Sequence, residues 1–181
     1  MGTSHTALVV IDVQVGVMAE AHEGDRVIEN IATLVDRARA AGIPVVWVQH
    51  SASGMEEESA EWEIVSTLAP LANEPRVRKK YGDSFESTDL REVLDERDVS
   101  KLVIVGAQTD ACVRSTLHGA LARGYDATLV SDAHTTEDMR PWGSPISPEQ
   151  AIGYTNLYWS FSRTAEHAGS VVPTAEVAFT E

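Results

Sequence analysis

The sequence is poor in cysteine, in basic residues and in long apolar runs, and each shortage excludes a class of protein. Cys112 is the only cysteine in 181 residues, so neither a disulfide framework nor a cysteine-based zinc cluster can form within the chain. Basic side chains number 14 against 28 acidic ones, a net charge of −14, which disfavours binding to the phosphates of nucleic acid. No stretch approaches the ~20 apolar residues of a membrane span, and no secretion signal is recognisable. We therefore predict a cytoplasmic protein that binds neither nucleic acid nor membrane.

What the sequence does contain is an alternation of short apolar runs and amphipathic segments. Apolar runs bounded by polar residues are typical of strands that are buried on both faces. The predicted strands are residues 7–12, 45–48, 76–80, 101–107, 127–130 and 171–172. Apolar residues at helical spacing predict helices in most of the intervals. One predicted helix begins after a cap at Asp25, and another begins after a cap at Ser87 or Thr88. The other predicted helices cover residues 62–68, 113–121 and 149–161.

This alternation predicts the fold class. Strands separated by helices form right-handed crossovers, which build a parallel sheet covered on both faces. We predict one three-layer α/β/α domain over residues 1–181, with six parallel strands in the order 3-2-1-4-5-6. In that order the first and fourth strands are neighbours, and ligands bind at the crevice at their carboxyl ends.

Two chemically useful side chains fall at that crevice. Asp12 ends the first strand, and Cys112 follows the fourth strand where a helix begins. A thiol in the first turn of a helix faces unpaired N–H groups, which favour the thiolate and could hold an oxyanion. A lone cysteine is more often a small core residue, and an aspartate after a strand often caps a turn. The position of both at the ligand-binding edge favours a nucleophile and its general base.

Lys79 and Lys80 end the third predicted strand at the same edge of the sheet. A lysine in such a place is usually a solvated surface charge. Inside the crevice it would keep Asp12 ionised and stabilise negative charge on a substrate. The residues alone leave open which of the two lysines would do this.

Three ordered motifs resemble those of the isochorismatase-like cysteine hydrolase superfamily. The first is Asp12-Val-Gln14, at the end of the first strand. The second is the segment 79–88, which is similar to the family's Lys-x-x-x-Ser-Ala/Gly-Phe. The third is the segment 106–113, which matches Gly-x-x-Thr-x-x-Cys-Val. The resemblance extends from Thr6 to about Thr136. The Ser-Ala pair of the family reads Asp83-Ser84 here, which marks a variant branch.

The resemblance implies a catalytic triad of Asp12, Lys79 and Cys112. The family lysine stands six residues before the phenylalanine of the second motif, here Phe85, and this spacing selects Lys79 over Lys80. The family also carries a cis peptide bond four residues before its cysteine, which corresponds to Ala107–Gln108. The backbone N–H groups of Gln108 and Cys112 would then form the oxyanion hole.

Two departures from known members narrow the expected chemistry. Nicotinamidases of the superfamily bind zinc through an Asp-x-His cluster after the second strand, where this chain has the single imidazole of His50. We therefore expect no metal and no cofactor. Isochorismatases proper lack the cysteine nucleophile, so Cys112 favours cleavage of a C–N bond. The pattern is most similar to the amidohydrolase branch that includes streptothricin hydrolase.

Further side chains near the strand ends are candidates for contact with substrate. These are Gln14, Gln49, His50, Phe85 and His134. Trp47 lies inside a predicted strand and is expected in the core. For His134, a turn-capping role competes with substrate contact.

We therefore predict a metal-independent amidohydrolase that cleaves a small amide or lactam through a thioester. The alternatives are a metal-assisted amidase of the nicotinamidase type and a redox-sensing thiol protein on the same scaffold. The absence of a second cysteine, which could resolve a sulfenic acid, counts against the redox alternative. The resemblance also implies a homo-oligomer, a dimer or tetramer.

Overall fold

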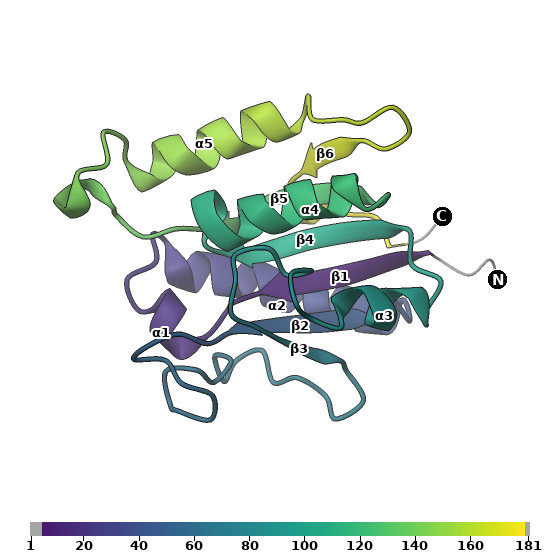
Figure 1. Cartoon of the computed structure of the whole chain (residues 1–181), viewed down its shortest axis with the longest axis horizontal. Helices are drawn as coiled ribbons and strands as arrows, with labels where there is room; N and C mark the ends of the chain where they lie inside the picture. The colour runs from purple at the N-terminus through teal and green to yellow at the C-terminus, as the bar shows by residue number, and fades with distance from the viewer. Residues whose placement is uncertain (1–4, 180–181) are drawn as a thin grey trace.

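Six parallel strands form one sheet in the order β3-β2-β1-β4-β5-β6 (Figure 1). The computed structural model describes residues 5–179. The strands are β1 (Thr6–Ile11), β2 (Val45–His50), β3 (Arg76–Lys79), β4 (Lys101–Ala107), β5 (Asp126–Thr135) and β6 (Gly169–Val172). All pairs of neighbouring strands are parallel. The predicted α/β class and strand order are confirmed.

Helices cover both faces of this sheet, with α2 on one face and α3 and α4 on the other (Figure 1). The α-helices are α1 (Val15–Met18), α2 (Gly24–Ala40), α3 (Leu90–Asp95), α4 (Arg114–Ala122) and α5 (Pro148–Trp159). A π-helical turn, η1 (Thr109–Val113), precedes α4, and 3₁₀ turns cover η2 (Arg140–Trp142) and η3 (Thr174–Glu176). No helix among residues 5–179 is long and apolar enough to span a bilayer.

The surroundings of β1 explain why its sequence is a continuous apolar run. Successive side chains of a strand point to opposite faces, so Leu8 and Val10 pack against the α2 side while Val9 and Ile11 pack against the α3–α4 side. All four are buried. Both faces therefore require apolar residues, and no polar alternation remains.

Four local features differ from the sequence-based expectations. Residues 62–68 form turns rather than a helix, because the backbone there pairs with the segment after β1, with Val15 N–H donating to the Glu63 carbonyl at 2.9 Å. The short helix α1, which follows β1, was not predicted. The fifth strand continues to Thr135, so His134 lies within β5 and not after it. Asp25 lies in the first turn of α2 without capping it, and Glu23 occupies the N-cap position.

The carboxyl ends of β1 and β4 lie against each other. Gly106 has φ +118°, and a Cβ atom built on it would lie 2.0 Å from the carbonyl oxygen of Ile11. Only glycine allows this approach. It brings the residues that follow the two strands, Asp12 and the segment after Ala107, to one edge of the sheet.

Candidate active site

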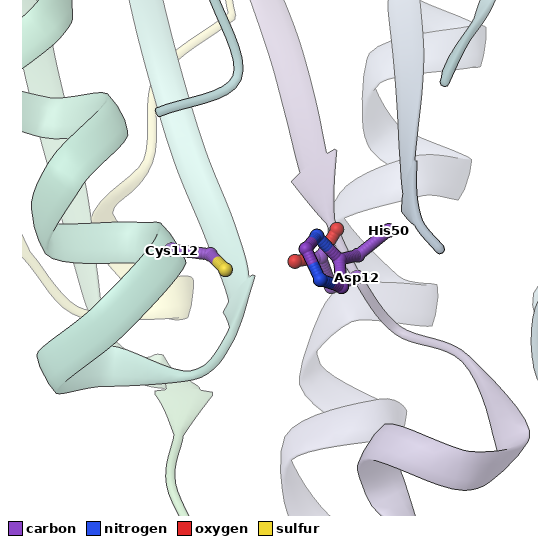
Figure 2. A group of neighbouring side chains, drawn as sticks. All are labelled: Asp12, His50 and Cys112. Carbon is purple, nitrogen blue, oxygen red and sulfur yellow. The ribbon is translucent and has the colours of Figure 1, made fainter. Parts of the chain in front are cut away.

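Asp12, Lys79 and Cys112, which are far apart in the sequence, meet at the carboxyl edge of the sheet. Lys79 Nζ lies 2.7 Å from Asp12 Oδ2 and 3.2 Å from Cys112 Sγ. Asp12 follows β1, Lys79 ends β3, and Cys112 belongs to the π-helical turn after β4. Figure 2 shows the side chain of Cys112 pointing from its turn towards Asp12 and His50.

The two adjacent lysines are placed differently. Lys79 is buried with no exposure of its side chain, whereas Lys80 is exposed. Lys79 is the last residue of β3, and the chain continues from it in a bend, so the two lysines point in different directions. Lys79, the residue selected by the spacing to Phe85, is the one that contacts Asp12 and Cys112.

The ammonium of Lys79 has more neighbours than hydrogens. Besides Asp12 Oδ2 and Cys112 Sγ, it lies 3.1 Å from Nδ1 of His50 and 3.2 Å from the carbonyl oxygen of Tyr81. An ammonium has three hydrogens to donate. The carboxylate, the imidazole and the carbonyl oxygen can accept all three hydrogens of the ammonium. No hydrogen of Lys79 is then needed by the sulfur, so Cys112 can remain a neutral thiol.

The charges of the site favour that neutral thiol. Burial, together with the negative charge of Asp12, raises the pKa of Cys112 to about 11. Burial also raises the pKa of Asp12 above its usual value, although the ammonium of Lys79 opposes the shift. The expectation that a helix terminus favours the thiolate is therefore wrong for this protein without substrate. The thiol is instead beside a carboxylate whose affinity for a proton is increased.

The backbone that carries Cys112 is distinctive. The peptide bond between Ala107 and Gln108 is cis, and the next residues form the π-helical turn η1. The N–H groups of Ala111 and Val113 both donate to the Gln108 carbonyl, each at 3.1 Å. Gln108 and Cys112 therefore belong to one tight turn at the end of β4.

His50 is a fourth side chain at this site, and Figure 2 shows its ring beside Asp12. Burial, and then the charge of Lys79, lower the pKa of His50 below 6.5. The imidazole is therefore neutral at pH 7, and Nδ1 accepts a hydrogen bond from Lys79. This arrangement leaves the second nitrogen, Nε2, carrying the ring proton.

Gln14, which follows β1, and Gln49, in β2, bind backbone groups. Gln14 donates to the carbonyls of His50 and Trp62 and accepts from the His50 N–H. Gln49 also donates to the Trp62 carbonyl, at 3.1 Å. Both glutamines are buried. They hold the turns after Ser51 against the ends of β1 and β2.

Phe85 and His134 are both held by contacts within the protein. Phe85 lies in the core cluster on the α3–α4 face and stacks on Tyr125 with ring centroids 5.6 Å apart. His134 is buried, and each of its ring nitrogens has a partner, Thr109 Oγ1 at 2.8 Å and Asn156 Oδ1 at 2.9 Å. Trp47 is in the core, as expected.

Asp83, which stands where the family motif has serine, forms contacts with two other segments. Its carboxylate pairs with Arg123 at 3.0 Å and accepts from the backbone N–H of Phe85. A Cβ atom on Gly119 would lie 2.5 Å from that carboxylate, so the acidic side chain occupies space that a glycine of α4 leaves free. Asp83 therefore ties the second motif to α4.

Sequence reasoning did not single out Thr109, Asp110 or Asn156. Thr136, the residue after β5, donates through Oγ1 to the Asp110 carboxylate of η1 at 2.6 Å, and Thr109 of η1 contacts His134 of β5. The threonine of the Gly-x-x-Thr motif was visible in the sequence, but its partner, 25 residues away in the chain, becomes apparent only in the fold.

A resident metal does not fit these residues as they lie. Donor atoms of Asp12, His50 and Cys112 lie within 4.8 Å of one another. The positively charged end of Lys79 is in contact with all three, at 2.7, 3.1 and 3.2 Å. A cation that used the same donors would be repelled by the ammonium.

Fold and site together define an α/β protein with a cysteine, a carboxylate and a lysine at the carboxyl edge of its sheet. Residues 6–144 match the model of the isochorismatase domain. The chain belongs to the isochorismatase family, which confirms the resemblance of the three motifs.

Known proteins of similar sequence include hydrolases. Streptothricin hydrolase of Streptomyces noursei is 34% identical over 168 residues, 90% of this chain and 58% of that protein. A second match to a protein of this name and organism covers 55% of its length. The chain thus spans little more than half of these relatives. Ureidoacrylate amidohydrolase of Rhizobium rhizogenes is 25% identical, with 91% of this chain and 85% of that protein covered.

The fold is shared with solved structures. A cysteine hydrolase from Pseudomonas syringae pv. phaseolicola superposes with a TM-score of 0.85 at 23% identity, covering 97% of this chain and 92% of that chain. At this level of identity the likeness concerns the fold alone.

Proposed function

We propose that the protein is a metal-independent cysteine hydrolase that cleaves a C–N bond, other than a peptide bond, in a small amide or lactam. One observation carries the proposal: the buried ammonium of Lys79 lies 2.7 Å from Asp12 Oδ2 and 3.2 Å from Cys112 Sγ. A nucleophile, a proton acceptor and a positive charge in contact are the components of nucleophilic acyl transfer. The names of the relatives, a streptothricin hydrolase and an amidohydrolase, support this reaction class.

The first half of the proposed reaction forms a thioester. Asp12 takes the proton of Cys112 as the sulfur attacks the amide carbonyl. The raised pKa of Asp12 suits this role, because a carboxylate with higher proton affinity is a better base. The N–H groups of Gln108 and Cys112 donate to the oxyanion. When the tetrahedral intermediate collapses, Asp12 gives the proton to the departing nitrogen, and the amine or ammonia leaves.

The second half regenerates the thiol. Asp12, again ionised, takes a proton from water as the water oxygen attacks the thioester carbonyl. The sulfur then leaves and receives that proton, and the carboxylic acid product is released. Lys79 stabilises the negative charge wherever it resides, on carboxylate or on sulfur, through its short contacts to both.

The test is hydrolysis of a panel of small carboxamides, lactams and ureides, measured as released amine or ammonia. Cys112→Ala is expected to lower turnover by at least about 1,000-fold, since covalent catalysis is lost altogether. Lys79→Met should also be severely impaired, whereas Lys80→Met, at the exposed neighbouring position, should keep wild-type turnover. Retention of a tenth of wild-type turnover by Cys112→Ala would refute the mechanism.

The alternatives give different results in the same assay. A metal-assisted amidase would lose activity with a chelator and regain it with zinc. A redox-sensing thiol protein would hydrolyse none of the panel and would instead form a sulfenic acid on Cys112 with peroxide. A cysteine hydrolase forms an acyl adduct that intact-mass measurement detects and hydroxylamine removes.

We also propose a homo-oligomer, with α5 at the contact between copies. Tyr154 and Leu157 lie on this helix and Phe161 lies just after its end, and they are 65%, 57% and 74% exposed. Trp142, on the loop before α5, is 82% exposed. Large apolar side chains gathered on one face mark interaction surfaces. Light scattering should give a multiple of 19.6 kDa, and Phe161→Glu should shift it towards the monomer.

One domain over residues 1–181 and a cytoplasmic location stay predictions of the sequence.

A further inference from the structure

His50 and Lys79 are neighbours across β2 and β3. The two residues are paired in the register of the parallel strands, and Lys79 Nζ lies 3.1 Å from His50 Nδ1. The side chain of Gln14 binds both backbone groups of His50, accepting from its N–H at 2.8 Å and donating to its carbonyl at 3.0 Å. The imidazole is therefore held beside the ammonium.

Nδ1 of His50 acts as an acceptor in this contact. An ammonium donates hydrogen bonds and accepts none, so a proton on Nδ1 would face a second donor. Burial, and then the positive charge of Lys79, lower the pKa of His50 below 6.5, and the charge of Asp12 opposes this shift only in part. The neutral ring thus accepts one hydrogen of Lys79 at pH 7.

That hydrogen is one for which Cys112 competes. The ammonium also lies 2.7 Å from Asp12 Oδ2, 3.2 Å from the Tyr81 carbonyl oxygen and 3.2 Å from Cys112 Sγ. Asp12 carries a charge opposite to that of the ammonium, and the Tyr81 acceptor is a backbone group. The acceptor of His50 is a neutral side chain, so its removal releases a hydrogen for the sulfur without changing the charge of the site.

We propose that His50 is a positioning residue that keeps Cys112 a neutral thiol by accepting the hydrogen of Lys79 that the sulfur would otherwise receive. A hydrogen bond to the charged form of a group favours that form. Without the imidazole acceptor, the ammonium donates to the sulfur, and the thiol releases its proton to solvent at a lower pH. This role requires no hydrolysis, so it is independent of the proposed function.

The test compares His50→Leu with His50→Asn, whose side chains are similar in volume. The side-chain oxygen of asparagine can take the place of Nδ1 and accept from Lys79, whereas leucine has no acceptor. The rate of alkylation by iodoacetamide is measured from pH 6 to pH 11, because the thiolate is the reactive form. Cys112 is the only cysteine, so the rate reports on this residue alone.

The rise of the alkylation rate with pH should move to lower pH in His50→Leu. At pH 8 this variant should react at least about fivefold faster than the wild type, since its thiolate is stabilised by the released hydrogen. His50→Asn should keep the wild-type profile. A mere gain in access to the sulfur would raise the rate equally at every pH, and that result would contradict the proposal.

A second comparison shows whether the effect passes through Lys79. In the Lys79→Met background, His50→Leu should leave the pH profile of alkylation unchanged, because no ammonium hydrogen remains to be released. The proposal is overturned if the shift persists in that background, if His50→Leu has the wild-type profile, or if His50→Asn shifts as far as His50→Leu.

A measurement on the wild-type protein does not depend on how the variants fold. Nitrogen NMR of the histidine rings at pH 7 should show His50 neutral, with its proton on Nε2. A proton on Nδ1 would overturn the proposal, because the ring could then accept nothing from Lys79. None of these results depends on whether any amide is hydrolysed, so this inference and the proposed function can fail separately.

Discussion

Thr109 Oγ1 lies 2.8 Å from Nδ1 of His134, and this buried contact joins β5 to the turn that carries Cys112. The direction of the bond follows from its neighbours. Asn156 donates through Nδ2 to the Ser131 carbonyl at 3.1 Å, so its Oδ1 faces His134 and accepts from Nε2. Nδ1 therefore accepts from the hydroxyl of Thr109. His134 is thus a positioning residue for the π-helical turn.

Thr109→Val should lower kcat of the proposed reaction about tenfold with little change in KM. The substitution keeps the shape of the side chain but leaves Nδ1 of His134 buried without a donor, which costs about 1–3 kcal/mol of folding free energy. Displacement of the turn also moves the Gln108 and Cys112 N–H groups. Steady-state kinetics and urea denaturation measure the two effects.

Thr109→Ser is the matched control for that prediction, since serine retains the hydroxyl. It should restore most of kcat and of the stability. Equal loss in both variants would mean that the methyl group, and not the hydrogen bond, holds the turn.

His134 also predicts how stability depends on pH. Burial lowers the pKa of His134 from 6.5 to about 4. The unfolded chain therefore takes up a proton on His134 at a higher pH than the folded chain. As the pH falls from 6.5 to 4, this group lowers the free energy of unfolding by up to about 3 kcal/mol. The free energy of unfolding in urea, measured at pH 4.5 and pH 7, should decrease less for His134→Gln than for the wild type. A parallel decrease in both proteins would contradict the assignment.

The reactivity of Cys112 without substrate should report its raised pKa. An ordinary cysteine becomes thiolate near pH 8.5, whereas burial and Asp12 raise the pKa of Cys112 to about 11. The rate of alkylation by iodoacetamide should therefore still rise about tenfold per pH unit beyond pH 9. Asp12→Asn removes the negative neighbour and should move this rise to lower pH. A plateau near pH 8.5 in the wild type would show that the thiol is not perturbed.

Gly106→Ala should destabilise the fold by about 3 kcal/mol or more. Its φ is +118°, and a Cβ atom would lie 2.0 Å from the Ile11 carbonyl oxygen, so β1 and β4 would have to separate. Gly143→Ala is the control, because Gly143 has φ +99° with nothing within 4 Å and loses only its favourable backbone conformation, about 1 kcal/mol. Urea denaturation compares the two, and similar losses would show that the close approach is unimportant.

Part of this protein could be predicted from local features of the chain. Apolar runs such as that of β1 placed the strands, and the order of strands was that of the doubly wound fold class. The resemblance to the second family motif selected Lys79 over Lys80, and the structure places Lys79 in contact with Asp12 and Cys112. The turns at 62–68 were mistaken for a helix, since their structure comes from pairing with residues after β1.

The roles of several polar side chains could not be predicted in that way. The side-chain amides of Gln14 and Gln49 both donate to the Trp62 carbonyl, a contact that the sequence did not reveal, and contact of these residues with substrate stays a prediction. The direction of the pKa shift of Cys112 was missed because a helix terminus is visible in the sequence, whereas burial and the charge of Asp12 are not.

The sequence by itself determined the strands, the helices that separate them, their order and the identity of the three residues that meet at the edge of the sheet. These follow from local periodicity and from motifs whose residues are near one another in the chain. Only the tertiary structure decided how charge is distributed among those residues. The pKa of a thiol or a carboxyl depends on burial and on charges brought in from β1, β2 and β3, and no local pattern records which side chains the fold will bring into contact.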